Sequence, residues 1–130
     1  MLVSDLMTRK LRTLGPDDGV EDALKLIEEL FIRHVPIVDA ENRLVGLVTQ
    51  RDLLAWEHKN APNGPLKGIM RANLVTASPD QTLRSAAELM IVNKYGCLPV
   101  VEQGKLVGII TETDFLKLAI FPLGNAARPK

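Results

Sequence analysis

The chain has 130 residues, and sixteen Lys and Arg residues balance sixteen Asp and Glu residues, so the formal net charge is zero. A neutral chain has no long-range positive field to attract nucleic acid or an anionic membrane surface. Only 4% of the residues are aromatic, which leaves few rings on which bases could stack. We therefore expect neither a nucleic-acid partner nor a membrane partner.

The length and a hydrophobic content of 46% fit one compact domain with a single core. No apolar run approaches the roughly 18 to 20 residues that a membrane-spanning helix needs. The amino terminus lacks the pattern of a secretion signal, and the single Cys97 cannot form an internal disulfide. These features predict a soluble protein of the cytoplasm.

Two copies of one pattern make up most of the chain. Residues of the first half recur at a constant offset of 63, as Pro16 does at Pro79. The turn at residues 40–43 is one residue shorter in the second copy, and after it the offset is 62, as between Thr49 and Thr111. Internal repetition at fixed spacing indicates repeated structural units.

Each copy contains the same elements in the same order. A short segment is followed by an extended run, a Pro-containing turn, a helix, a two-stranded hairpin and a closing helix. Apolar residues at helical spacing, such as Ala23 and Ile27, predict the helices, and short apolar runs joined by polar turns predict the hairpins. Before the closing helices, the predicted elements are residues 4–7, 11–14, 20–31, 35–38 and 44–48, then 68–70, 74–77, 83–90, 98–101 and 106–110.

These elements divide the chain into a first repeat at residues 1–60, a linker at 61–65, a second repeat at 66–121 and a tail at 122–130. A unit of about 60 residues has a marginal core, so we expect the two sheets to pack against each other. The predicted fold class is α/β, or more strictly α+β. Two pseudo-twofold-related β-α-β-β-α units form one module.

Both hairpins end in the pattern Gly-apolar-apolar-Thr-x-x-Asp, at residues 46–52 and 108–114. One interpretation is a capping box, in which the Thr and the Asp satisfy amides at the start of the next helix. The other is a ligand site, because a strand-to-helix junction presents amides and a positive dipole end, and a carboxylate there can accept hydrogen bonds from ribose hydroxyls. The residues alone leave both interpretations open.

The twice-repeated order of elements and its closing motif resemble the tandem cystathionine-β-synthase (CBS) domain pair, also called a Bateman module, in the form of a stand-alone CBS-domain protein. The resemblance covers nearly the whole chain. It implies that the motif residues hold the ribose of AMP, ADP or ATP, or less often of S-adenosylmethionine or NAD. Those residues are Thr49, Asp52, Thr111 and Asp114.

The resemblance also implies that each motif faces the amino-terminal segment of the other repeat. Thr111 and Asp114 would then face the segment from Ser4 to Met7, and Thr49 and Asp52 the segment from Lys67 to Met70. Family members often bind phosphates with basic residues just before the second strand. The corresponding candidates are Arg33 and His34, with Arg51 on the closing helix, whereas the second copy has Gly96, Cys97 and Thr113.

Two further features of the sequence each have a functional and a simpler interpretation. Cys97 and His34 occupy equivalent positions and suggest nucleophilic or metal chemistry, but no third group has suitable spacing, so burial is the better interpretation of the cysteine. At residues 89–92 and 116–121, apolar side chains are expected around the helix and not only along the one face that would pack on the core. They predict a homodimer, with burial between the repeats as the alternative.

Together these observations predict a regulatory module that is not an enzyme, contains no metal site and requires no cofactor. It would bind an adenine nucleotide between the repeats and signal to an unknown effector protein. The alternative is a dimerising interaction module with vestigial ligand sites.

Overall fold

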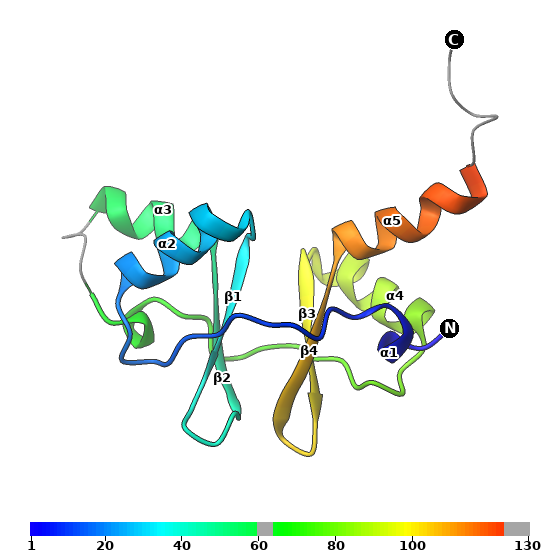
Figure 1. Ribbon diagram of the computed structural model, residues 1–130, viewed down its shortest axis with the longest axis horizontal. Helices are drawn as coiled ribbons and strands as arrows, with labels where there is room; N and C mark the ends of the chain where they lie inside the picture. The colour runs from blue at the N-terminus through cyan, green and yellow to red at the C-terminus, as the bar shows by residue number, and fades with distance from the viewer. Residues whose placement is uncertain (60–63, 124–130) are drawn as a thin grey trace, which may run out of the picture.

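The computed structural model describes residues 1–59 and 64–123, which form two similar α+β halves side by side (Figure 1). Each half has a two-stranded antiparallel hairpin, as the sequence predicts, with helices on one side of it (Figure 1). The first half contains α2 (Val20–Leu30), β1 (His34–Val38), β2 (Leu44–Thr49) and α3 (Gln50–Lys59). The second contains α4 (Leu83–Asn93), β3 (Cys97–Glu102), β4 (Lys105–Thr111) and α5 (Glu112–Leu123). Short helices α1 (Val3–Leu6) and η1 (Leu66–Gly68) precede the two units.

The first predicted strand of each unit is reduced to a single residue that pairs with the hairpin. Leu14 bridges Ile37 in parallel, and Ala77 bridges Val100 in the same way. The Leu14 N–H donates to the Pro36 carbonyl at 3.2 Å, and its own carbonyl accepts from Val38 at 2.9 Å. A proline follows each bridging residue two positions later and lacks an N–H, so the pairing ends there.

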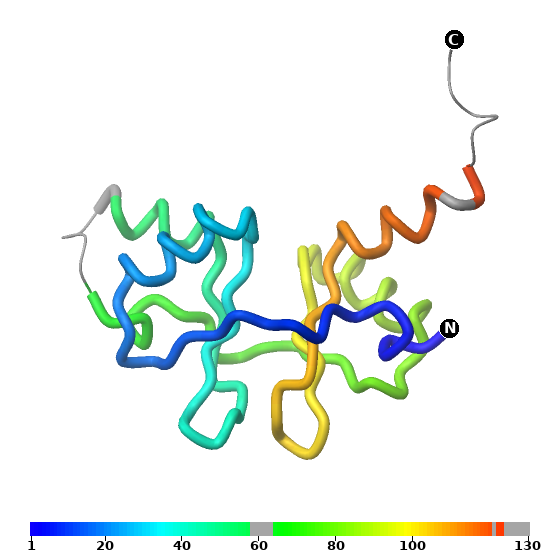
Figure 2. Tube along the Cα trace, viewed as in Figure 1, coloured from blue at the N-terminus to red at the C-terminus, as the bar shows by residue number. Residues whose placement is uncertain are grey.

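The short segments before the two units are exchanged between the halves. Val3 and Met7, near the amino terminus, belong to the core of the second half, where they pack with residues of α4, β3 and β4. Leu66, which follows the linker, is fully buried in the core of the first half. Each core therefore contains residues from both repeats. Figure 2 shows the two connecting segments crossing between the halves.

Backbone pairing holds each exchanged segment against a hairpin. Thr8 and Ile109 exchange two hydrogen bonds of 2.9 and 3.0 Å, and Arg71 and Leu47 do the same. The glycine at the start of each closing motif makes room for this approach. A Cβ on Gly108 would lie 2.7 Å from the Met7 sulfur, and the equivalent Gly46 lies under Met70 in the same way.

The ends of the predicted units fall partly outside the described residues. Linker residues 61–63 and tail residues 124–130 are not described. Helix α5 continues to Leu123, two residues beyond the predicted end of the second repeat, although it contains Pro122. Within the described residues, no helix is long and apolar enough to span a membrane.

Candidate functional site

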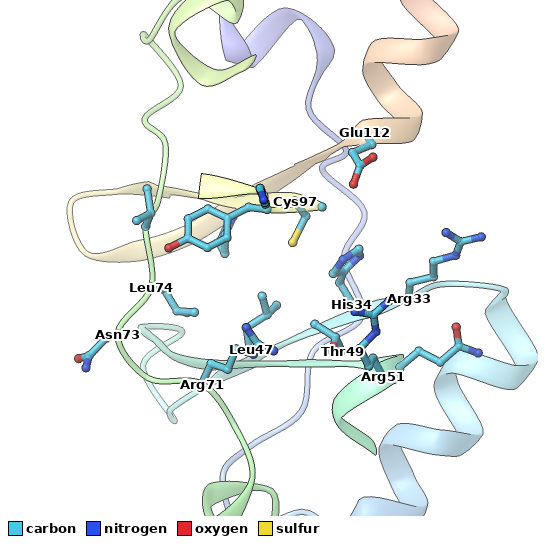
Figure 3. A pocket seen from close by; sticks show the side chains of 16 residues that line it. Arg33, His34, Leu47, Thr49, Arg51, Arg71, Asn73, Leu74, Cys97 and Glu112 are labelled. Atoms are coloured by element: carbon cyan, nitrogen blue, oxygen red, sulfur yellow. The ribbon is translucent and has the colours of Figure 1, made fainter. Parts of the chain in front are cut away.

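A cavity of roughly 450 Å³ lies between the two hairpins (Figure 3). Leu47, Cys97 and Ile109 form a small apolar cluster where the hairpins meet, with Leu74 packed against it. In Figure 3, Arg33, His34 and Arg51 gather at one end of the cavity and Asn73 and Leu74 at the other. The remaining lining residues are Leu47, Thr49, Gln50, Arg71, Val75, Lys94, Tyr95, Gly96, Cys97, Pro99 and Glu112.

The first closing motif meets this cavity at the end of β2. Thr49 lines it, and its hydroxyl accepts a hydrogen bond of 3.2 Å from the Asp52 N–H at the start of α3. The Asp52 carboxylate turns toward the exchanged segment, where both of its oxygens accept from the Arg71 guanidinium at 3.0 and 3.1 Å. This pair links the helix start of one repeat to the leading segment of the other.

The electrostatics of Asp52 follow from these contacts. Burial raises the pKa of its carboxyl group, but hydrogen bonds from Arg71 and Thr49 outweigh that effect, so the pKa lies below its ordinary value. Asp52 is therefore ionised at neutral pH. A carboxylate in this state can accept hydrogen bonds from hydroxyl groups through the lone pairs that Arg71 does not use.

The amides at the start of α3 are largely occupied. The Gln50 N–H donates to the Arg33 carbonyl at 2.9 Å, and the Asp52 N–H bonds to Thr49. In the second half the Glu112 N–H donates to the Gly96 carbonyl at 3.1 Å in the equivalent way. The Gln50 and Asp52 amides are thus not free to bind an anion. Instead, the first of these hydrogen bonds holds Arg33 beside the motif.

The second closing motif forms a capping box. The Thr111 N–H donates to the Asp114 carboxylate at 2.9 Å, and the Asp114 N–H donates to the Thr111 hydroxyl at 3.3 Å. Neither residue lines the cavity, and neither do Ser4 and Met7. Met7 is buried beside Gly108, and the Ser4 N–H donates to the Pro79 carbonyl. The structure therefore places the exchanged segment against the second half, but these four residues are not gathered in this cavity.

The segment from Lys67 to Met70, which was expected to face Thr49 and Asp52, does not line the cavity. Met70 packs against the first core beside Gly46. Lys67 points elsewhere, because its ammonium pairs with the exposed Asp17 at 3.1 Å, and it does not line the cavity. The residue that meets Asp52 is Arg71, one position beyond the segment singled out in the sequence.

Cys97 and His34 both line the cavity, as their equivalent positions suggest. Burial, aided by the charge of Glu112, raises the pKa of the Cys97 thiol to about 12, so the group stays protonated and weakly nucleophilic. Burial and the charge of Arg33 lower the pKa of His34, and Glu112 opposes them. Among the described residues, no three His, Cys, Asp or Glu side chains could together hold a metal ion.

Sequence reasoning missed several residues of the cavity. Arg71 is positioned by its pairing with Leu47, and Lys94 by its own left-handed backbone conformation (φ 58°) at the end of α4. Asn73 reaches the cavity from the segment that crosses between the halves (Figure 2), and Tyr95 from just beyond the end of α4. None of these contacts is visible as a local pattern. Thr8 pairs with β4, and the repeat offset of 63 makes Arg71 its equivalent, which pairs with β2. The repeat is thus the one signal in the sequence that indicates the position of Arg71.

Comparison with known proteins shows similarity to the CBS domain family. A model of the CBS domain matches residues 3–59 and 66–120. The chain is 43% identical to AcuB from Vibrio cholerae, whose assignment to acetoin utilization is provisional, with a TM-score of 0.91 over 98% of both chains. It is 30% identical to CBSX2 from Arabidopsis thaliana, solved in complex with AMP, with a TM-score of 0.85 over 95% of this chain and 98% of that one.

A third structure is the CBS domain pair of protein MJ0100 in complex with 5′-methylthioadenosine and S-adenosyl-L-methionine. It shares 29% identity and a TM-score of 0.85 over 92% of this chain and 95% of the other. Among curated sequences, inosine-5′-monophosphate dehydrogenase of Methanocaldococcus jannaschii is 37% identical over 97% of this chain, which spans only 25% of that enzyme. A CBS domain-containing protein of Dictyostelium discoideum is 34% identical over 92% of both chains.

Proposed function

The chain belongs to the CBS domain family, and from this premise we propose that it is a regulatory module that binds an adenosine-containing ligand in the cavity between its hairpins. The observation that carries the proposal is that the Thr49 hydroxyl and several cationic side chains line one cavity. The ionised Asp52 does not itself line the cavity, but it lies at its edge, bonded to the lining residue Arg71. The most suitable ligands are AMP, ADP and ATP. We expect an affinity in the micromolar range, equivalent to about 8 kcal/mol.

The lining suits the three parts of a nucleotide. Leu74, Val75 and Pro99 offer apolar surface for a base, with Tyr95 as an aromatic neighbour. Thr49 lies between this end and the basic end in Figure 3, where a ribose would sit close to the Asp52 carboxylate. A phosphate would then lie at the end that carries the arginines. Thr111 and Asp114, with Ser4 and Met7, remain candidates for a second site in the pseudo-symmetric position.

The similar structures support this choice of ligand. CBSX2 was solved with AMP, and the MJ0100 domain pair with two adenosine-containing molecules. The protonated and buried Cys97 argues against the alternative of an enzyme built on Cys97 and His34. The chain spans 25% of the dehydrogenase and 42% of MJ1225, a second relative from the same organism, so we assign neither protein's activity to it. We propose instead that ligand occupancy is passed to an effector protein in the cytoplasm.

A thermal-shift assay with adenosine, AMP, ADP, ATP and S-adenosylmethionine tests the proposal. A ligand that binds only the folded chain adds about 2.7 kcal/mol of stability at a concentration 100 times its Kd, which raises the Tm by several degrees. We expect such a rise with at least one adenine nucleotide and none with GTP or CTP. If no adenosine ligand raises the Tm, the alternative of an interaction module with vestigial sites is favoured.

We further propose that the chain forms a homodimer through the helices of its second half. Ile91 and Val92 on α4 are 76% and 78% exposed, and Leu116 and Ile120 on α5 are also exposed, so burial between the repeats does not account for them. In Figure 1, α5 runs outward from its half, whereas α3 lies alongside α2. A large exposed apolar area of this kind is typical of an interface.

Light scattering should give twice the mass of the chain at tens of micromolar protein. Ile91→Asp combined with Val92→Asp should give a monomer, because two charges would have to be buried in the interface. Arg84→Gln, at an exposed position of the same helix, is the control and should remain a dimer. A monomeric wild-type chain would contradict the proposal.

A further inference from the structure

We propose that the cavity selects adenine nucleotides with two or more phosphates over AMP and over S-adenosylmethionine. This inference rests on the proposed function, because it names the ligand class of the same site. Two observations support the inference. Cationic side chains line the cavity, and the equivalent positions of the other repeat carry uncharged residues.

Four cationic side chains line the cavity, and they are contributed by both halves. They are Arg33, Arg51, Arg71 and Lys94. At the equivalent positions the chain has Gly96, Thr113, Thr8 and Phe31, none of which carries a charge. The fold does not require cations at these positions, since the equivalent positions of the other repeat are uncharged. A specific local role is the simplest account of their concentration around one cavity.

Most of this charge has no partner within the described part of the chain. Arg71 pairs with Asp52, but no ion pair of Arg33, Arg51 or Lys94 is found among the described residues. Glu112 is the only acidic residue in the lining. The lining of the cavity therefore carries more positive than negative charge. A ligand with several negative charges would relieve the repulsion among the cations, and one phosphate would neutralise only part of it.

Two of the arginines lie where the phosphates of a bound nucleotide would extend. Arg33 and Arg51 lie together with His34 at one end in Figure 3, on the far side of Thr49 from Leu74. A nucleotide with its base near Leu74 and its ribose near Thr49 would extend its phosphates toward these arginines. Their guanidinium groups bind phosphate oxygens with two parallel hydrogen bonds, and the Lys94 ammonium supplies a further charge.

The same charges disfavour a sulfonium ligand. S-adenosylmethionine carries a positive sulfur and a positive ammonium group where a nucleotide carries phosphates, and one carboxylate does not offset both. Like charges within a few ångströms destabilise a bound state, and a cavity that is partly shielded from water increases the effect. The chain should therefore differ in ligand choice from the MJ0100 domain pair, whose structure contains S-adenosyl-L-methionine.

Titration calorimetry on the full chain with adenosine, AMP, ADP, ATP and S-adenosylmethionine tests the inference. We expect ATP to bind roughly tenfold more tightly than AMP and S-adenosylmethionine to bind most weakly. Arg51→Thr introduces the residue of the other repeat, and Lys94→Asn removes a charge while keeping a residue that tolerates a positive φ. Each variant should weaken ATP binding about three- to tenfold and change adenosine binding less than about twofold.

Two further variants distinguish this account from general effects of charge. Glu112→Gln removes the opposing acid and should tighten ATP binding without changing adenosine binding. Arg84→Gln removes a cation on the exposed face of α4 and should change neither. Equal affinities for ATP, AMP and adenosine would overturn the inference while leaving the proposed function intact. Absence of binding by every adenosine ligand would overturn both.

Discussion

Replacing Asp52 by alanine should weaken the binding of an adenine nucleotide about 100-fold. A carboxylate that accepts two hydrogen bonds from ribose hydroxyls contributes about 1.5 to 3 kcal/mol for each bond to the charged group, and 1.4 kcal/mol corresponds to a factor of ten. The pKa of Asp52 is lowered, so it is a charged acceptor throughout the neutral range. Titration calorimetry with wild type and variant measures the loss.

Asp22→Ala is the matched control for this prediction. The Asp22 carboxylate accepts from the Gly19 N–H at 2.9 Å in the first turn of α2. Asp52 lies in the first turn of α3, but only Asp52 bonds to Arg71, which lines the cavity. Asp22→Ala should lose about 1 kcal/mol of stability with its cap, whereas Asp52→Ala loses the ion pair with Arg71. Only Asp52→Ala should lose affinity. Unchanged binding in Asp52→Ala would remove Asp52 from the site.

The second large effect concerns stability. Leu66→Ala should lower the free energy of unfolding by about 2 to 5 kcal/mol, because the side chain is fully buried and its removal leaves a cavity. The leucine begins the second repeat in sequence, yet it lies in the core of the first half with Val20 and Leu53. Hydrogen exchange should therefore show loosened amides in α2 and α3 as well as a lower midpoint in urea.

Leu54→Ala is the control for this experiment, since that leucine is 54% exposed on α3 and its truncation should cost well under 1 kcal/mol. If Leu66→Ala costs no more than Leu54→Ala, Leu66 does not complete the first core. If the loosened amides lie only in the second half, the exchange of segments between the halves is contradicted.

The fold was predictable because the same pattern of helices and strands occurs twice in the sequence. Apolar residues at helical spacing such as Ala23 and Ile27, and at the equivalent positions of the second copy, predicted the helices, and these are confirmed. The hairpins were predictable from apolar runs joined by polar turns, and the structure confirms both. The resemblance to the CBS family is confirmed by the match to residues 3–59 and 66–120. The assignment of ribose-binding residues stays a prediction.

Other features could not be read from the sequence because they depend on contacts between distant segments. The predicted strand at residues 11–14 shrinks to one bridging residue, Leu14. The resemblance places Lys67 in the segment that faces Thr49 and Asp52, but its ammonium pairs with Asp17 at the surface. Arg71 carries no motif of its own and meets Asp52 only because β2 pairs with the exchanged segment.

The two closing motifs also differ in contacts that the sequence could not predict. Thr49-x-x-Asp52 and Thr111-x-x-Asp114 are equivalent in sequence, and both capping and ligand binding were open interpretations. In the structure Asp114 bonds within its own motif, whereas Asp52 also bonds to Arg71 beside a cavity. The difference arises from the partner segment, where Arg71 takes the place equivalent to Thr8.

The most direct test of the account is a two-dimensional NMR titration of the full chain with AMP and ATP, which reports where the ligand binds as well as whether it binds. Binding in the cavity should shift the backbone amides of Thr49, Leu74, Val75 and Tyr95, in saturable fashion, and leave the amides of α2 unchanged. Absence of shifts, or shifts confined to residues outside the cavity, would contradict the claim that the space between the hairpins is an adenine-nucleotide site.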